Sequence, residues 1–300
     1  MKKSNRNNVK LTVFTPTYNR AHTLPRLYNS LVRQSCQDFK WLIIDDGSSD
    51  NTRILVDTWR NEQNGFDIVY NYKKNGGMHT AHNRAYELID TELNVCIDSD
   101  DFMADDAVES ILKCWNEKGS DKLAGIIGLD ADFGGEIIGK GFPDGMEKTT
   151  LSGYYSRGGA GDKKLVYRTE VMKKYPPYPV FKGEKYVSLG YKYLLCDQDY
   201  ELLTLDKVLC YVEYQADGSS KNMLKQYMRN PNGFAFIRKV DMKYDKTLKR
   251  KFMTCVHYVS SSMIGKNKRF VKESPKKLMT ILAVPFGWAL TCYIKLKSRE

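Results

Sequence analysis

The sequence predicts an α/β fold with a doubly wound, mostly parallel sheet and a helical C-terminal extension. Short β-rich runs and helix-like segments alternate four times between residues 10 and 97, which is typical of a parallel sheet with helices on its faces. Hydrophobic residues make up 42% and charged residues 28% of the 300 positions. These shares lie near globular averages and exclude wholesale disorder, a collagen-like chain and a coiled-coil rod.

The elements of the N-terminal part follow from hydrophobic periodicity and from stop signals. The first strand covers residues 10–15 and stops at Pro16, and a helix over residues 23–34 carries leucines at helical spacing. A second helix, which carries Trp59, follows a run of serine and aspartate residues that are good N-caps. We expect the other elements of this part to be strands at residues 39–44, 66–72 and 93–97 and a helix at residues 80–89.

Polar clusters follow each of the four predicted strands. They cover residues 15–20, 45–50, 73–77 and 98–101. Because ligands of parallel α/β sheets bind outside the carboxyl ends of the strands, we expect these clusters to converge on one crevice.

The cluster after the fourth strand has the pattern Asp-x-Asp. Asp98 and Asp100 flank Ser99, and two carboxylates together with phosphate oxygens are a suitable ligand set for Mg²⁺ or Mn²⁺. Three acids within four residues repel one another unless a cation lies among them. The alternative is a solvated helix N-terminus in which Asp101 caps the helix that starts near Ala104.

The cluster after the third strand has weaker signals. Its two lysines and its Gly76-Gly77 pair could offer a cation and bare backbone N–H groups to a diphosphate, although such a loop is more often a plain turn. His79 and His82 could suggest a metal pair, but no third ligand lies nearby in the sequence. Ordinary polar positions on a helix are the better interpretation.

Taken together, residues 10–115 resemble the donor half of a family 2 glycosyltransferase with the GT-A fold, a Rossmann-like α/β fold. The resemblance is carried by residues 14–20, 43–50, 75–77 with Asn83, and 98–101, four motifs in the family's order. It implies that Asp98 and above all Asp100 hold Mn²⁺ or Mg²⁺ on the diphosphate of a nucleotide-sugar, expected to be a UDP-sugar. The nucleotide-sugar-binding residues that it implies are Thr15, Pro16, Tyr18, Asp46, Asn83, Asp98, Ser99 and Asp100.

Beyond residue 160 the resemblance is weaker and points to the acceptor half of bacterial capsule and exopolysaccharide enzymes of this family. The family usually has an acidic Glu-Asp motif here for its catalytic base, whereas this sequence has Gly183-Glu184-Lys185. Glu184 is therefore the first candidate for the base and Asp199 the second. A carboxylate that accepts the proton of the acceptor hydroxyl accelerates attack about 10²–10⁴-fold. A metal on the leaving diphosphate offsets its growing charge, and this pair implies a single, inverting displacement.

Other enzyme classes that use similar motifs lack support in this sequence. A sugar nucleotidyltransferase needs a glycine-rich loop after its first strand, and residues 15–19 contain no glycine. A haloacid-type phosphatase has its Asp-x-Asp after the first strand, and a dinucleotide-binding dehydrogenase needs GxGxxG, which is absent. A nucleic-acid binder would explain the net charge of +11, but the donor region is not basic.

The second part of the chain has looser patterns. We expect glycine-rich loops at residues 134–145 and 153–161 with no helix between them, and a proline-rich extended connector at residues 175–179. The expected division is a donor-binding half at residues 1–118, an acceptor-binding half at 119–240 and a basic, membrane-associating helical region at 241–300. The expected elements are strands at residues 165–168 and 207–214 and helices at residues 226–239 and 248–264.

Positive charge is concentrated at the C-terminal end. Residues 221–300 contain 19 lysines and arginines and 4 acidic residues, a local balance of +15. Residues 278–294 contain no charge and are flanked by lysines, and about 17 residues is the lower limit for a spanning helix. We expect this segment to lie in the surface of an anionic membrane, beside a glycan or lipid-linked acceptor, rather than to cross it; the alternative is a buried core helix.

The cysteines and the N-terminus bear on the cellular compartment. The seven cysteines are scattered without a CxxC pair, which argues against a disulfide framework or a cysteine zinc site and favours a reducing compartment. Residues 1–10 are polar and basic, without the apolar stretch of a secretory signal. We therefore expect a cytoplasmic protein that is peripheral on the inner face of the cell membrane and does not bind nucleic acid.

Overall fold

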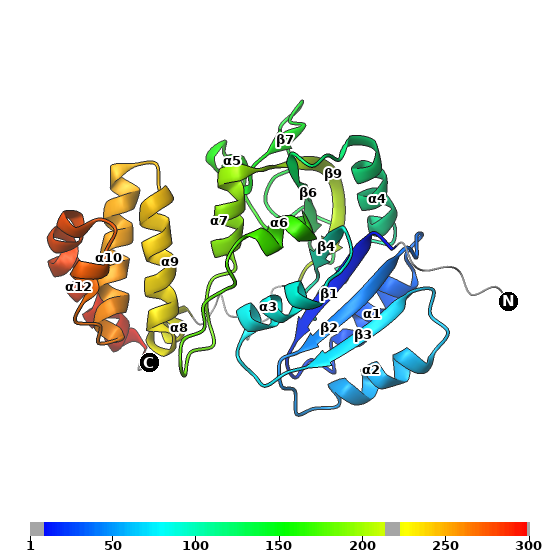
Figure 1. The fold of residues 1–300 in the computed structure, drawn as a ribbon, viewed down its shortest axis with the longest axis horizontal. Helices are drawn as coiled ribbons and strands as arrows, with labels where there is room; N and C mark the ends of the chain where they lie inside the picture. The colour runs from blue at the N-terminus through cyan, green and yellow to red at the C-terminus, as the bar shows by residue number, and fades with distance from the viewer. Residues whose placement is uncertain (1–8, 214–222, 299–300) are drawn as a thin grey trace. The chain divides into compact units, whose positions relative to one another are not determined.

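A computed structural model describes residues 9–213 and 223–298, and the chain divides into two compact units (Figure 1). Unit 1 comprises residues 1–177 and 192–213, and unit 2 comprises residues 178–191 and 214–300. The absence of a secretory signal was predicted from residues 1–10. Residues 1–8 of this segment lie outside the described residues. The expected three-part division stays a prediction, because it concerns which ligand each part binds.

Unit 1 is built on a nine-stranded sheet in the order β3-β2-β1-β4-β8-β6-β9-β5, with β7 paired to β9. The first four strands pair in parallel, β8 runs antiparallel between β4 and β6, and β6 and β9 are parallel. The predicted α/β fold with a mostly parallel sheet is thereby confirmed. The strands are β1 (Leu11–Thr17), β2 (Phe39–Asp45), β3 (Asp67–Tyr72), β4 (Leu93–Cys96), β5 (Phe102–Met103), β6 (Leu123–Ala131), β7 (Lys148–Thr149), β8 (Lys163–Arg168) and β9 (Glu201–Tyr211).

Helices cover both faces of this sheet, so the sheet is doubly wound. Leucines of α1 (Leu24–Val32), Trp59 of α2 (Thr52–Asn61) and Trp115 of α4 (Ala107–Lys118) share one apolar cluster with Trp41 of β2. On the other face, Phe14 of β1 contacts the rings of His82 and Tyr86 from α3 (Met78–Leu88). The remaining helices of this part are α5 (Leu151–Ser156), α6 (Thr169–Lys174) and α7 (Gly190–Asp199).

Between residues 119 and 200 the structure is more regular than the sequence predicted. All nine residues of β6 are buried, and a strand buried on both faces lacks the polar alternation by which strands are recognised. The prediction of no helix between the two glycine-rich loops is wrong, because α5 forms there with the Thr150 hydroxyl accepting a hydrogen bond from the Gly153 N–H. Six residues are too few to show a helical period.

Unit 2 is helical and carries the C-terminal extension that was predicted. Its helices are α8 (Met223–Arg229), α9 (Pro231–Tyr244), α10 (Leu248–Ile264), α11 (Phe270–Glu273) and α12 (Lys277–Lys297). The single helix predicted at residues 226–239 is wrong: it is two helices, since Pro231 cannot continue α8 and starts α9 instead. In Figure 1, α10 lies between α9 and α12, and it packs closely on both.

Candidate functional site

The loops after β1 and β2 are tied together by hydrogen bonds. The backbone N–H of Asn19 donates to the Ser48 hydroxyl over 2.9 Å, and the Ser49 N–H donates to the Asn19 side-chain oxygen over 2.8 Å. Asn19 has a φ of 53°, a left-handed conformation that asparagine tolerates better than most residues. These contacts hold two of the four predicted polar clusters against each other at one edge of the sheet.

Asp46 fixes the loop after β3 to the same edge. Its carboxylate is buried, with 4% of the residue exposed, and it accepts hydrogen bonds from the N–H groups of Gly76 over 2.9 Å and of Gly77 over 2.7 Å. The Lys73 ammonium also donates to this carboxylate, and the Asn75 amide donates to the Asp46 backbone carbonyl over 2.7 Å. The aspartate that was predicted to contact the nucleotide therefore also organises the glycine loop beside it.

The other predicted donor-site residues differ in how far their side chains are exposed. Thr15 and Pro16 belong to β1, and the Thr15 hydroxyl accepts a hydrogen bond from the Trp41 indole over 3.0 Å. Tyr18 is 49% exposed. Asn83 lies on α3 and is partly buried. The Thr15 side chain thus serves the core, and the residue is fully buried.

The two histidines of α3 are buried, and burial keeps both neutral. Burial lowers the pKa of His79 to about 4 and the pKa of His82 to about 3. Nε2 of His82 lies 3.6 Å from the Cys96 sulfur, in contact with β4. We expected ordinary polar positions on a helix; instead both residues are buried, and the His82 ring packs against Phe14 of β1.

The acidic cluster after β4 is larger than the Asp-x-Asp pattern suggested. Asp101 and Asp130, from the end of β6, are both buried, and the ammonium of Lys164 on β8 lies 3.9 Å from the carboxylate of Asp101 and 3.6 Å from that of Asp130. Sequence reasoning missed Lys164 and Asp130, because only the pairing of β8 with β6 brings them together. A charge can stay buried only where opposite charges or hydrogen bonds compensate it.

Burial and crowding shift the pKa values of this cluster upward. Burial raises the pKa of Asp98, and the nearby Asp100 carboxylate raises it further against the opposing charge of Lys164. The pKa of Asp101 rises to about 8, mainly through burial, with Lys164 lowering it and Asp98 raising it. Carboxyl groups in such surroundings gain from a nearby cation, since a cation stabilises their charged form.

Arg26 of α1 holds the Asp-x-Asp segment in position. Its guanidinium donates to the backbone carbonyl of Asp100, lies 4.2 Å from the ring centroid of Phe133 and forms a 3.3 Å ion pair with Glu213. The sequence offered no direct signal for Arg26, because it is one arginine in an amphipathic helix and its partners are 74 or more residues away.

The residues present are compatible with a divalent metal that shares its ligands with a diphosphate. Within residues 9–213 and 223–298, no group of three or more histidine, cysteine, aspartate or glutamate side chains could hold a metal ion. Asp98 and Asp100 therefore supply at most a pair of carboxylates. Mg²⁺ and Mn²⁺ are commonly bound by one or two carboxylates together with substrate phosphates, so this donor set fits a metal that arrives with the nucleotide.

The two candidates for the catalytic base lie in different units and have different surroundings. Glu184, in unit 2, is buried, and its carboxylate accepts hydrogen bonds from both N–H donors of Asn232, backbone over 3.0 Å and side chain over 2.7 Å, and from the Gly233 N–H over 2.8 Å. These donors lie at the start of α9, which Glu184 thereby caps. Asp199, in unit 1, has about half of its side chain exposed and accepts one hydrogen bond from the Tyr175 hydroxyl over 2.8 Å.

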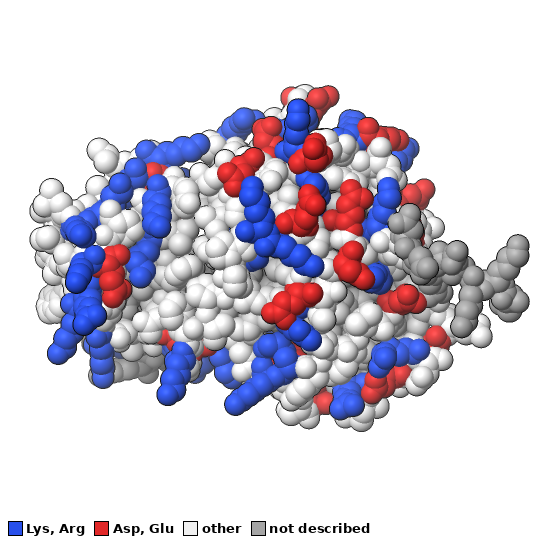
Figure 2. Space-filling view, in the orientation of Figure 1, with Lys and Arg blue, Asp and Glu red and all other residues white. Residues whose placement is uncertain are grey.

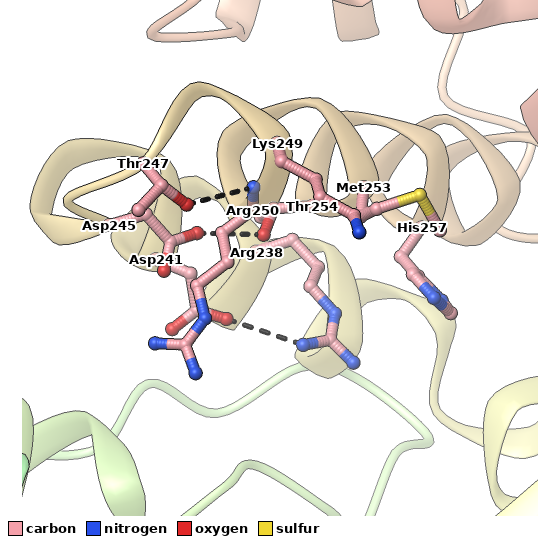
Figure 3. A pocket seen from close by; sticks show the side chains of 9 residues that line it. All are labelled: Arg238, Asp241, Asp245, Thr247, Lys249, Arg250, Met253, Thr254 and His257. Atoms are coloured by element: carbon pink, nitrogen blue, oxygen red, sulfur yellow. Dashed lines mark hydrogen bonds and ion pairs between the residues drawn. The ribbon is translucent and has the colours of Figure 1, made fainter. Parts of the chain in front are cut away.

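A cavity of about 620 Å³ lies in unit 2 (Figure 3). The side chains that line it come from α9 and α10 and the turn between them. Arg238 forms an ion pair with Asp241 over 3.3 Å, and the Thr254 hydroxyl donates to Asp245 over 2.9 Å. None of the predicted donor-site or base residues lines this cavity. The lining residues are Arg238, Asp241, Asp245, Thr247, Lys249, Arg250, Met253, Thr254 and His257.

Comparison with known proteins gives a family match and several partial relatives. The model of the family "Glycosyl transferase family 2" matches residues 12–175, more than half of the chain. Glycosyltransferase GlyG of Streptococcus pneumoniae is 26% identical over 115 residues, which are 38% of this chain and 38% of GlyG. Poly(ribitol-phosphate) beta-N-acetylglucosaminyltransferase TarS of Staphylococcus aureus is 28% identical over 144 residues, 47% of this chain and 24% of TarS. The matched stretches span well under half the length of these relatives.

Solved structures show the same fold. Residues 1–349 of S. aureus TarS in complex with UDP-GlcNAc superimpose with a TM-score of 0.59 at 20% identity, covering 91% of this chain and 79% of that chain. The mannosyltransferase PcManGT from Pyrobaculum calidifontis, in complex with GDP-Man and Mn²⁺, gives a TM-score of 0.56 at 14% identity, covering 94% of this chain and 74% of that chain. At these identities the likeness establishes the fold, which is the GT-A fold expected from the sequence.

Proposed function

Because the chain belongs to glycosyltransferase family 2, we propose that it transfers a sugar from a nucleotide-sugar to a hydroxyl of a glycan or lipid-linked acceptor, with inversion, in the synthesis of a cell-surface polysaccharide. The observation that carries this proposal is the arrangement of the four polar loops. The β1, β2 and β3 loops are joined through Asn19 and Asp46, and the acidic segment after β4 lies at the same edge, where the Ile97 N–H bonds to the Phe14 carbonyl over 3.0 Å.

The donor is proposed to be a UDP-sugar bound along this edge. The similar structures were solved with UDP-GlcNAc and with GDP-Man, which supports a nucleotide-sugar as the ligand class. Asp46 orients the glycine loop through the Gly76 and Gly77 N–H groups, and the half-exposed Tyr18 is available to a base and ribose. The proposed donor-contacting residues are Thr15, Pro16, Tyr18, Asp46, Asn83, Asp98, Ser99 and Asp100. They lie in the proposed donor half, residues 1–118, ahead of an acceptor half at 119–240 and a membrane-associating region at 241–300.

Asp98 and Asp100 are proposed to hold Mn²⁺ or Mg²⁺, which as a Lewis acid would offset the charge that develops on the leaving diphosphate. Arg26 donates to the backbone carbonyl of Asp100 and so restrains the main chain from which the carboxylate extends. Preorganised charges of this kind are worth more than mobile ones, because no reorganisation is needed when the bond breaks.

A carboxylate is proposed to accept the proton of the acceptor hydroxyl, with Glu184 and Asp199 as the candidates. Three N–H donors hold the Glu184 carboxylate, so it already serves the start of α9. Asp199 is more exposed and has fewer partners. Substitution of each residue separates the two assignments, as described in the Discussion.

The C-terminal helix is proposed to hold the protein on the inner face of the cell membrane. Among the residues that the structure describes, α12 is the one helix whose length and composition would allow it to cross a membrane. Apart from Ile294, its buried residues are small or polar, and its exposed face carries large apolar ones, the reverse of a helix in water. Thr280, Ala283, Gly287, Thr291 and Ile294 are buried; Leu278, Ile281, Leu282, Phe286, Trp288, Tyr293 and Leu296 are exposed.

The charge of unit 2 supports an anionic membrane as the partner. Figure 2 shows lysine and arginine side chains spread over the helices of this unit, and the sequence balance of residues 221–300 is +15. Each basic residue near an anionic surface contributes about 1 kcal/mol. Small residues let helices approach closely inside a membrane. In α12 the small residues already pack against α10, so they are not available for contact with a second helix inside a membrane. We therefore propose that α12 lies in the interface with its apolar face toward the lipid.

Vesicle binding tests this placement without removing α12. Full-length protein should co-sediment at low salt with vesicles that contain anionic lipid, and the double substitution of Leu282 and Phe286 to serine should release it. Leu248→Ser, at a residue that is 74% exposed on α10, is the matched control and should bind like the wild type. Equal binding by all three proteins, or no binding by the wild type, would contradict the proposal. Truncation is less suitable, since it would uncover α10.

A panel of nucleotide-sugars in a thermal-shift assay with Mn²⁺ tests the proposed function. A ligand present at 100 times its Kd stabilises the folded state by about 2.7 kcal/mol, which a melting curve resolves. We expect a UDP-sugar to raise the melting temperature and Asp46→Ala to reduce the shift. No shift with any UDP-, GDP-, CMP- or dTDP-sugar would contradict the proposal.

A further inference from the structure

Lys164 has no role in the donor site as described so far, yet it lies within the acidic cluster. Its side chain is 11% exposed, and the carboxylates that it pairs with are 5% exposed at Asp101 and 3% at Asp130. A lysine that loses its hydration in this way is tolerated only where negative charge compensates it. The strands β4, β8 and β6 are neighbours in the sheet, so the fold places this ammonium between Asp101, which follows β4, and Asp130, near the end of β6.

The four acids of the cluster fall into two pairs. Lys164 forms ion pairs with Asp101 and Asp130. Within the parts of the chain that the structure describes, no lysine or arginine forms an ion pair with Asp98 or Asp100, whose neighbours are the Cys96 thiol at 3.8 Å from Asp98 and Arg26 at the Asp100 backbone. Lys164 is therefore in direct ion-pair contact with Asp101 and Asp130 only, and its charge reaches Asp98 at longer range.

We propose that Lys164 is a built-in cation whose charge balances Asp101 and Asp130 and thereby sets the affinity with which Asp98 and Asp100 hold a divalent metal. The inference rests on the metal-assisted function proposed above. Charges in a buried site are weakly screened by salt and by solvent. Removal of a positive charge from this cluster should therefore raise the affinity for the metal, and removal of a negative charge should lower it.

Three variants test whether the sign of the removed charge decides if Mn²⁺ binding becomes tighter or weaker. With the full-length chain and saturating UDP, the concentration of free Mn²⁺ measured by electron paramagnetic resonance gives the dissociation constant of the metal. Lys164→Met removes a positive charge and should tighten Mn²⁺ binding roughly three- to tenfold. Asp130→Asn removes a negative charge and should weaken it by a similar factor. The double variant removes the pair and should return to the wild-type affinity.

A structural role for Lys164 would give a different pattern. If Lys164 only supported the fold, all three variants would bind Mn²⁺ more weakly, and that result would overturn the inference. Lys192→Met is the matched control, since Lys192 is also buried but donates to the backbone carbonyls of Met172 and Tyr175; its Mn²⁺ affinity should not change. Melting curves establish that each variant is folded.

The outcome distinguishes this inference from the proposed function. If Lys164→Met does not fold, Asp130→Asn and the double variant still decide, because a double variant as weak as Asp130→Asn contradicts the charge argument. If the wild type binds Mn²⁺ with UDP but the affinities of the variants do not rise, fall and return to the wild-type value as expected, the inference alone fails. If the wild type binds no Mn²⁺ in the presence of UDP, the metal-assisted function itself is wrong.

Discussion

Asp46→Ala removes the carboxylate that joins two loops of the proposed donor site, and its cost in folding free energy follows from the contacts it breaks. The substitution leaves the N–H groups of Gly76 and Gly77 without an acceptor and the Lys73 ammonium without its counter-ion. A buried donor left without a partner costs about 1–3 kcal/mol. Lys73 and the two glycines are only partly buried, and the Lys73 ammonium keeps its hydrogen bonds to the Lys74 carbonyl and the Thr80 hydroxyl. Because the contacts share one carboxylate, they do not add, and we expect a loss of about 1–3 kcal/mol.

Urea denaturation followed by circular dichroism measures this loss. Asp46→Asn keeps one acceptor oxygen, but its NH₂ group cannot accept the hydrogen bond of the other glycine N–H. This variant should therefore lose roughly half as much folding free energy as Asp46→Ala. Asp57→Ala is the control: its ion pairs with Arg60 at 3.3 Å and Arg53 at 3.6 Å are exposed, and such pairs are worth about 0–1 kcal/mol. An Asp46→Ala variant as stable as Asp57→Ala would refute the reasoning.

Three further predictions concern the base, a buried histidine and the α10–α12 contact. Glu184→Gln should abolish sugar transfer and leave nucleotide-sugar binding intact if Glu184 is the base; normal transfer with reduced thermal stability would assign it to capping α9 alone. The pKa of His82 is about 3 when folded against 6.5 when unfolded, so the unfolded chain binds the extra proton. His82 thus adds stability above pH 6.5 that is lost toward pH 3, at about 1.4 kcal/mol per unit, and unfolding of His82→Gln should depend less steeply on pH; an unchanged slope would contradict this. Gly287→Val should destabilise the protein by about 1–3 kcal/mol, because its Cβ would lie 2.5 Å from Val259, whereas Ala289→Val on the exposed side should melt like the wild type.

The first half of the fold could be predicted from the sequence because its signals are local. Each of the strands β1 to β4 ends in a polar cluster, and each of the helices α1 to α3 shows its period within about ten residues. The register of parallel strands then requires the clusters to share one edge. The prediction that the polar clusters meet at one edge of the sheet is confirmed for the loops after β1, β2 and β3, which are hydrogen-bonded to one another.

The parts that were missed depend on contacts between distant residues. Lys164 and Asp130 look like ordinary surface charges in the sequence, and only the pairing of β8 with β6 brings them together. The strand β6 itself has no polar alternation to reveal it. The hydrogen bonds of Glu184 join residues 48 positions apart, so the capping of α9 could not be inferred from the motif around Glu184.

Calorimetry of UDP binding with and without Mn²⁺, for the wild type and for Asp100→Asn, tests the central claim most directly. If the acidic segment after β4 holds a metal on the diphosphate, Mn²⁺ should tighten UDP binding by the wild type at least tenfold, about 1.4 kcal/mol. Asp100→Asn should lose this gain and keep the metal-free affinity. Equal affinity with and without Mn²⁺ in the wild type, or an undiminished gain in Asp100→Asn, would contradict the account.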